Sequence, residues 1–144
     1  YQRLSQFKMA KSLYYDLLKN EAENKEEIIN NIISIMVEET PREALYLLDR
    51  LTKQNPSASF LLANMAMANE KIGDYESAIL CYQKALNIDP NNFNYSYNLA
   101  VLFDQKRDYE KAIEMYNLAI KNETSSEISS DLVKKRIDKL KQLI

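Results

Sequence analysis

The sequence is short of several residue types on which common active sites depend. It has no histidine, one cysteine and one glycine among its 144 residues. The missing histidine removes the commonest general base, the usual metal ligand and the serine-type triads. One cysteine makes neither an internal disulfide nor a zinc site, and one glycine is too few for a phosphate-binding loop. We therefore expect no enzymatic activity, no bound metal and no cofactor.

Charge and hydropathy speak against two further classes of partner. The formal net charge of −2 gives no long-range field that would attract nucleic acid or an anionic membrane. No apolar run approaches the roughly 18 residues of a membrane-spanning helix, so we expect neither nucleic-acid binding nor membrane insertion. The chain begins with Tyr1 rather than methionine and is interpreted as trimmed, so the lack of a signal peptide is uninformative. A cytoplasmic location is expected, and a periplasmic or other compartment stays open.

What the chain does contain is a period of 34 residues. The segment GDYESAILCYQKALNIDPNN overlays RDYEKAIEMYNLAIKNETSS, which lies 34 residues later. Two columns run through four copies: Ala10, Ala44, Ala78 and Ala112, and Tyr14, Leu48, Tyr82 and Tyr116. Apolar residues recur three and four apart within each block, which is typical of one helix face. Each block is therefore predicted to form two helices joined by a short turn, at Ser59–Ile72 and Tyr75–Asn87 in the clearest copy.

The period, the small residues in fixed columns and a proline near the block end resemble the tetratricopeptide repeat. The block 59–92 matches best, through Ala66, Gly73, Tyr75, Ala78, Tyr82, Ala85 and Pro90. The resemblance implies an all-α fold, a right-handed α-α superhelix or solenoid, with 1–144 as a single domain. Its expected parts are the second helix of a truncated repeat at 1–24, repeats at 25–58, 59–92 and 93–126, and a capping helix at 127–144.

In this family the first helix of each pair lines the concave groove of the solenoid, so the resemblance implies a binding surface there. The residues carried over to that surface are Ile29, Asn30, Ile33, Phe60, Ala63, Asn64, Met67, Lys71, Tyr97, Asn98, Val101 and Gln105. Neighbouring positions on the same face are Met36, Glu70, Asn94 and Asp104.

Three of these residues form a ladder, because Asn30, Asn64 and Asn98 recur at 34-residue spacing. A side-chain amide offers both a donor and an acceptor, so it can hold a peptide backbone without reading its side chains. The alternative is that these amides only bond to nearby backbone or water. The apolar residues among them favour an apolar or amphipathic ligand, or equally a helix from the missing N-terminal part or from a second copy of the chain.

The function that follows is a non-catalytic module or scaffold that binds a peptide or helix of a protein partner in the groove. The alternative is an assembly module that self-associates or packs on its parent chain, with homo-oligomers forming through the N-terminal half repeat. Family members that clamp a C-terminal carboxylate use groove lysines and an arginine. Ile29 and Ala63 stand at the candidate lysine positions and Asn98 at that of the arginine, which speaks against such a ligand.

Three local features complete the expectations. Gly73 falls where the first helix of the best repeat ends, a place that favours a positive φ, and its equivalents are Glu39 and Arg107. Glu38, Glu39 and Glu43 lie around the expected helix start at Thr40–Pro41 and are interpreted as compensating a helix dipole rather than as a carboxylate site. The stretch Thr124–Glu127 resembles a capping box, and it precedes an apolar stripe backed by basic residues. The stripe is Ile128, Leu132, Val133, Ile137, Leu140 and Ile144, and the basic residues are Lys134, Lys135, Arg136, Lys139 and Lys141. We interpret those cations as a solvated face rather than as a nucleic-acid or lipid contact.

Overall fold

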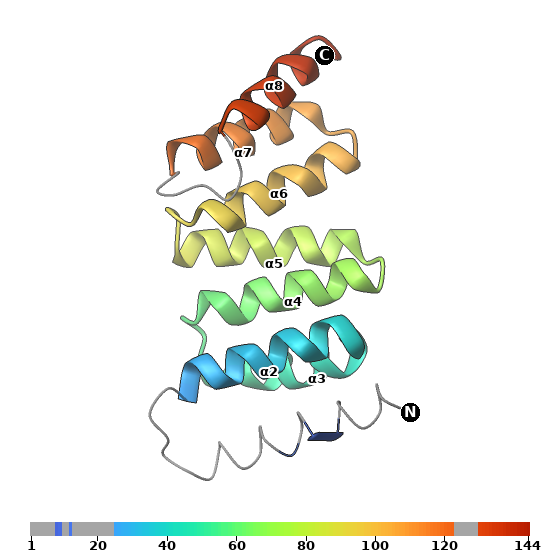
Figure 1. Ribbon diagram of the computed structural model, residues 1–144, viewed down its shortest axis with the longest axis vertical. Coiled ribbons are helices and arrows are strands. Elements are labelled where there is room, and N and C mark those ends of the chain that lie inside the picture. The colour runs from blue at the N-terminus through green and yellow to red at the C-terminus, as the bar shows by residue number, and fades with distance from the viewer. Residues whose placement is uncertain (1–7, 10–11, 13–24, 123–129) are drawn as a thin grey trace. The chain divides into compact units, whose positions relative to one another are not determined.

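The computed structural model describes residues 8–9, 12, 25–122 and 130–144 (Figure 1). Within residues 25–122 and 130–144 the chain forms seven helices and no strand, so the all-α class is confirmed. The helices are α2 (Lys25–Glu39), α3 (Pro41–Gln54), α4 (Ser59–Lys71), α5 (Tyr75–Ile88), α6 (Phe93–Gln105), α7 (Tyr109–Lys121) and α8 (Ser130–Lys141). The half repeat expected at 1–24 falls almost entirely outside the described residues, and the capping box at Thr124–Glu127 lies outside them. The division into repeats stays a prediction.

Short polar side chains fix where several helices begin. Asp74 accepts a hydrogen bond from the Ser77 amide before α5 (3.2 Å), and Asn92 accepts one from the Tyr95 amide at the start of α6 (3.1 Å). Such caps satisfy amides that have no partner inside the helix. Pro41 stands in the first turn of α3, where its missing amide costs nothing. The predicted bounds of α4 and α5 agree with the observed ones to within one residue.

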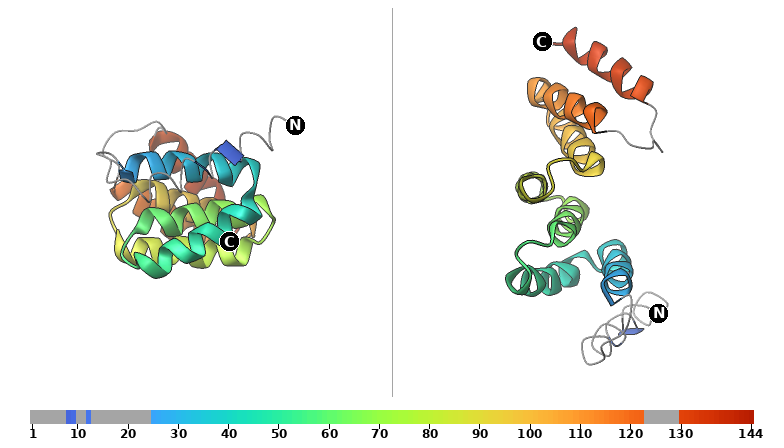
Figure 2. Two further views of the ribbon diagram at one scale, coloured as in Figure 1. Left: turned by 90° about the horizontal axis from the view of Figure 1, so that it is seen from below. Right: turned by 90° about the vertical axis from the view of Figure 1, so that its left-hand side faces the viewer.

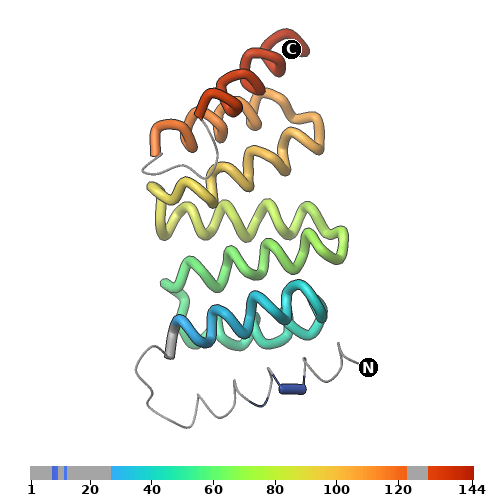
Figure 3. The backbone as a smooth tube through the Cα atoms, viewed as in Figure 1, coloured from blue at the N-terminus to red at the C-terminus, as the bar shows by residue number. Residues whose placement is uncertain are grey.

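The predicted positive φ at the end of α4 is confirmed. Gly73 has φ +84° and its repeat equivalent Arg107 has φ +66°. In both turns the next amide reaches back five residues: Asp74 N donates to Asn69 O (2.8 Å), and Asp108 N donates to Phe103 O (2.9 Å). This is the Schellman pattern, which needs one left-handed residue. Figure 3 traces the two short turns in the chain.

These two turns give a matched pair of substitutions. A Cβ on Gly73 would meet no atom within 4 Å, so Gly73→Ala acts through backbone conformation alone. We expect it to lower the free energy of unfolding by about 1 kcal/mol, and Arg107→Gly to raise that free energy by a similar or smaller amount. Urea unfolding of both variants measures the two changes. Two effects of the same sign would contradict the account.

The equivalent turn after α2 is built differently. Thr40 N donates to Met36 O (2.7 Å), the ordinary α-helical spacing, and α2 continues to Glu39 without a left-handed residue. Pro41 follows at once, and it has no backbone N–H to donate to a carbonyl at the end of α2. The expectation that Glu39 resembles Gly73 in conformation is therefore wrong, because α2 ends in a direct turn into α3.

The helix α2 buries a face that only partly matches the one that the repeat alignment predicts, because Ile32, the equivalent of Ala66, is buried but its neighbours on the predicted face are not all buried. On α4 and α6 the deeply buried positions include Ala66 and Phe103, and the α2 equivalent of Phe103 is Ile35, which is 47% exposed. Instead, Ile33 and Met36 are each 1% exposed and pack into a core with α3 and α4. Isoleucine, methionine and valine surround most of α2, so its apolar pattern does not select one face.

The described residues belong to two compact units, residues 1–78 and 79–144, and the division falls inside α5. The core of the first unit lies between α2, α3 and α4. Its buried members are Ile32, Ile33, Met36, Val37, Ala44, Leu48, Leu51, Leu61 and Ala68. Ala44, a member of the repeating alanine column, is 1% exposed, and its small side chain lets the helices approach closely.

In the second unit α6 packs on α7 and α7 packs on α8, as the right-hand view of Figure 2 shows. The repeat columns are buried here too, since Ala112 and Ala119 are fully covered and Tyr116 is 4% exposed. The helix α8 contributes Val133, Ile137 and Leu140, spaced four and three apart on one face. Of the helices described here, none combines the length and the apolar character needed to cross a bilayer.

Candidate functional site

The surface formed by the first helix of each predicted helix pair is called the first-helix face. In the first unit it is made by α2 and α4, which lie against each other. The expected asparagine ladder begins here: Asn64 Nδ2 on α4 donates to Asn30 Oδ1 on α2 at 3.1 Å. The same nitrogen donates to Phe60 O at 2.9 Å, one turn earlier on α4. Asn64 therefore ties two successive first helices together. Asn98 belongs to the second unit, so the contact seen within the first unit joins only Asn30 and Asn64.

The Asn64 amide is held in one orientation and has an unused acceptor. Its nitrogen faces two oxygens, so a flipped amide would set oxygen against the Phe60 carbonyl. The side chain is 3% exposed, and no donor in the described part of the chain reaches Asn64 Oδ1. A buried acceptor without a partner costs about 1–3 kcal/mol. The site thus holds an unsatisfied acceptor between two helices.

Apolar and charged groups surround this amide pair. Phe60 is half-buried and Met67 is 37% exposed, and they stand about one turn on either side of Asn64 along α4. Farther along the two helices, Lys71 Nζ pairs with Glu38 at 2.9 Å, with both side chains largely in solvent. Glu38 was expected only to compensate a helix dipole. Its contact with α4 follows from the face that α2 presents, which the repeat alignment did not reveal.

The remaining predicted residues of this unit divide between core and surface. Ile33 and Met36 lie in the core, and Ala63 is 5% exposed, so the structure assigns these three to packing rather than to an open surface. Ile29 is half-buried and packs against the same core. The accessible part of the predicted set in this unit is therefore Asn30, Phe60, Met67 and Lys71, and their contact with a partner stays a prediction.

In the second unit the corresponding face belongs to α6. Tyr97, Asn98 and Val101 are half-buried and Gln105 is exposed. The Tyr97 ring stacks on Phe93 with centroids 5.8 Å apart and planes inclined by 11°. The same ring tilts against Tyr116 of α7 at 5.9 Å. An aromatic surface of this kind suits apolar side chains, because tyrosine offers a wide face with a polar end.

Asp104 was expected on the same face, but its carboxylate is paired with Arg136 of α8. Arg136 Nε and Nη2 donate to its two carboxylate oxygens at 2.7 and 2.6 Å, and the Tyr116 hydroxyl donates to Oδ2 at 3.0 Å. The Arg136 hydrogen bonds hold the pKa of Asp104 below its usual value. Burial, with the carboxylate as a second cause, raises the pKa of Tyr116 above its usual value. Arg136 is thus a structural contact rather than part of the solvated basic face.

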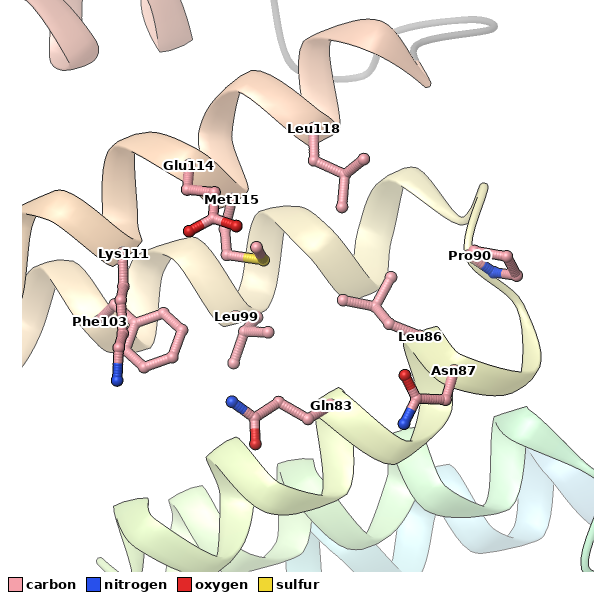
Figure 4. A pocket seen from close by; sticks show the side chains of 10 residues that line it. All are labelled: Gln83, Leu86, Asn87, Pro90, Leu99, Phe103, Lys111, Glu114, Met115 and Leu118. Atoms are coloured by element: carbon pink, nitrogen blue, oxygen red, sulfur yellow. The ribbon is translucent and has the colours of Figure 1, made fainter.

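This unit also has a groove that the sequence does not predict. A groove of about 430 Å³ lies between α5, α6 and α7, and Figure 4 shows its side chains converging. Its lining is Gln83, Leu86, Asn87, Pro90, Leu99, Phe103, Lys111, Glu114, Met115 and Leu118. Leu99 and Phe103 leave α6 on the side opposite to Tyr97 and Val101. The 34-residue period predicts stacked helix pairs, but it carries no signal for a space between them.

Two family models match the chain. One, described as a TPR repeat, covers residues 71–106, and one, described as a tetratricopeptide repeat, covers residues 93–124. Human tetratricopeptide repeat protein 21B is 31% identical over 90 residues, which are 62% of this chain. Those residues span only 7% of the human protein.

Solved structures share the fold at lower identity. The type III secretion translocator chaperone SycD of Yersinia enterocolitica superposes with a TM-score of 0.73 at 16% identity, over 88% of this chain and 90% of that one. The TPR2B domain of yeast Sti1, solved in a pHsp70 complex, gives 0.66 at 20% identity over 80% and 98%. MamA gives 0.66 at 20% identity over 98% and 80%. The expected solenoid class is confirmed by these likenesses.

Proposed function

The chain belongs to the tetratricopeptide repeat family, and on that premise we propose that it is a non-catalytic module that binds a polypeptide segment of a partner protein. The proposed binding surface is the first-helix face of each unit. The accessible residues are Asn30, Phe60, Met67 and Lys71 in the first unit and Tyr97, Asn98, Val101 and Gln105 in the second.

The observation that carries the proposal is the unsatisfied amide beside exposed apolar surface on α4. Asn64 Oδ1 has no donor within the described residues, and a peptide N–H would supply one. Phe60 and Met67 stand about one turn on either side of Asn64 along α4, so a segment bound across their side chains would pass close to this acceptor. Recovery of one buried hydrogen bond then favours the bound state by about 1–3 kcal/mol.

The surrounding groups favour an apolar or amphipathic segment. Met67 is flexible and polarizable, so it adapts to differing apolar partners, and Tyr97 with Phe93 adds aromatic area on α6. The one cation of the predicted set, Lys71, is paired with Glu38, so the predicted residues on α2 and α4 offer no unpaired cation to an acidic peptide.

Two proteins with a similar fold support peptide binding as a class of function. SycD is solved in complex with a peptide of the translocator YopD, and the Sti1 TPR2B domain is solved with pHsp70. Both are under 25% identical to this chain, so they support the kind of ligand and not its sequence.

A peptide library displayed on phage tests the surface and requires no identified partner. We expect selected peptides to be apolar or amphipathic, and Met67→Arg to weaken their binding at least tenfold, because the guanidinium brings a desolvation cost into an apolar contact. Isothermal titration with one synthetic selected peptide measures the change. Met67 is 37% exposed, so the variant should keep its melting temperature.

Tyr46→Arg is the matched control, since Tyr46 is 78% exposed on α3 of the same unit. It should leave the affinity unchanged. The proposal that peptides bind the first-helix face would be rejected if they bound Met67→Arg as tightly as the wild-type chain. It would also be rejected if the control variant lost as much affinity as Met67→Arg.

Self-association or packing on the parent chain is the competing role. The segment that motivated it, residues 1–24, lies almost wholly outside the described residues, and no observation in the described residues favours it. Light scattering over a hundredfold range of concentration separates the two roles: a constant monomer mass supports the binding module, and a mass that rises with concentration supports assembly.

A further inference from the structure

A continuous set of contacts runs from the C-terminal helix to the aromatic surface of α6. Arg136 on α8 makes a two-pronged contact with Asp104, at 2.6 and 2.7 Å. Asp104 also accepts the hydroxyl of Tyr116 on α7, at 3.0 Å. The Tyr116 ring lies 5.9 Å from Tyr97, which in turn stacks on Phe93. Three helices therefore meet at the Asp104 carboxylate, and the contacts continue through Tyr116 to Tyr97, a predicted binding residue.

The geometry restricts each member of this set. A guanidinium that donates through Nε and Nη2 holds a carboxylate in one plane, because the fork has fixed spacing. The Asp104 side chain is 10% exposed, so water competes little for its oxygens. Tyr116 is 4% exposed, and its hydroxyl has this carboxylate as its partner. Its ring is thus fixed at both ends, by core packing and by the hydroxyl contact.

Of these residues, Tyr97 is the one whose ring orientation depends on its neighbours. It is half-buried on α6, and its ring packs against Tyr116 on one side and against Phe93 on another. A tilted aromatic contact depends on the orientation of both rings. If Tyr116 is free to turn, the Tyr97 ring has no fixed surface to lie on. The order of the α6 surface therefore depends on a contact made by α8.

We propose that Arg136 is a positioning residue, which acts through Asp104 and Tyr116 to fix the Tyr97 ring and so sets the aromatic surface that α6 offers to a partner. The docking of α8 and the binding of a peptide at α6 are then linked. The link to binding rests on the proposed function, whereas the fixing of Tyr97 does not. The helix α8 thus does more than cover the end of the α7 core.

Fluorine NMR of the free chain, labelled with 3-fluorotyrosine, tests the positioning directly. The Tyr97 resonance is assigned as the one lost in Tyr97→Phe. We expect Arg136→Met to shift or broaden that resonance by more than its linewidth in fully folded protein. Lys135→Met, at the neighbouring exposed position on α8, should leave it in place.

Val133→Ala separates the effect of a less stable α8 from the effect of losing the Arg136–Asp104 contact. Val133 is 3% exposed on α8 and takes no part in the ion pair, so this variant weakens the α8 core while keeping Arg136. The Tyr97 resonance should keep its position in folded Val133→Ala. If Arg136→Met does not fold, Asp104→Asn decides, because it keeps the shape of the side chain and removes its charge.

An unchanged Tyr97 resonance in whichever of these two ion-pair variants folds would overturn the proposal, and so would an equal shift in Val133→Ala. A second experiment measures peptide binding, with a peptide selected on the wild-type chain. Arg136→Met should weaken the affinity for this peptide about threefold to thirtyfold. A shifted Tyr97 resonance without any peptide selected at α6 would support the positioning role and reject the proposed function.

Discussion

Replacing Leu140 by alanine is expected to lower the free energy of unfolding by about 3 kcal/mol. Leu140 is fully buried on α8, and its neighbours on the same face are Val133 and Ile137. Removal of the side chain loses its transfer free energy and leaves a cavity that the rigid helices fill only in part. Urea unfolding followed by circular dichroism measures the loss. It should appear as a lower transition midpoint with little change in slope.

Leu132→Ala is the matched control, because it makes the same change on the same helix at a residue that is 63% exposed. We expect a change within about 0.5 kcal/mol. Equal losses in the two variants would mean that α8 does not bury the face described above. Leu132 and Leu140 both belong to the apolar stripe of the sequence, so the pair also shows which members of the stripe are buried.

The Asp104–Arg136 contact carries the second large effect. Asp104→Asn is expected to lower the free energy of unfolding by about 2 kcal/mol at neutral pH, the range for a hydrogen bond to a charged group. The loss is smaller than for a fully buried pair, because the Arg136 side chain is 39% exposed and regains water. A double-mutant cycle with Arg136→Met isolates the pair from other contacts of either residue.

The same contact predicts a dependence on pH. Because Arg136 lowers the pKa of Asp104 in the folded chain, the unfolded chain binds more protons near the usual Asp pKa of 3.8. The stabilisation is therefore complete at neutral pH and is lost as pH falls from about 4 toward the lowered folded pKa. Unfolding at pH 7 and pH 3 should show the gap between wild type and Asp104→Asn shrinking. A gap that widens at pH 3 would contradict the ion pair.

Local features were well predicted wherever one residue type decides the conformation. Gly73 has the positive φ expected of a lone glycine at a helix end, and Arg107 shares it at the same place in the next repeat. Both follow from short-range chemistry, which a 34-residue period repeats. The repeated asparagines were visible in the sequence, but the bond that joins Asn30 to Asn64 across two helices was not predicted.

The missed features depend on how helices rotate and meet. An isoleucine-rich α2 has apolar residues on most of its surface, so only packing decided that Ile33 faces the core and Ile35 faces solvent. The Arg136 contact joins residues 32 positions apart on α6 and α8, and the basic residues around it on α8 are typical of a solvated face. Neither feature has a pattern that local spacing would reveal.

The claim at the centre of the account is that the first-helix face contacts a polypeptide. Site-specific incorporation of p-benzoylphenylalanine at Met67, with Tyr46 as the control site, tests it most directly in the protein expressed in cells. The account predicts light-dependent adducts to peptide segments of a separate protein from position 67, and few or none from position 46. Equal adducts from both positions, or adducts from position 67 only to copies of the same chain, would contradict it.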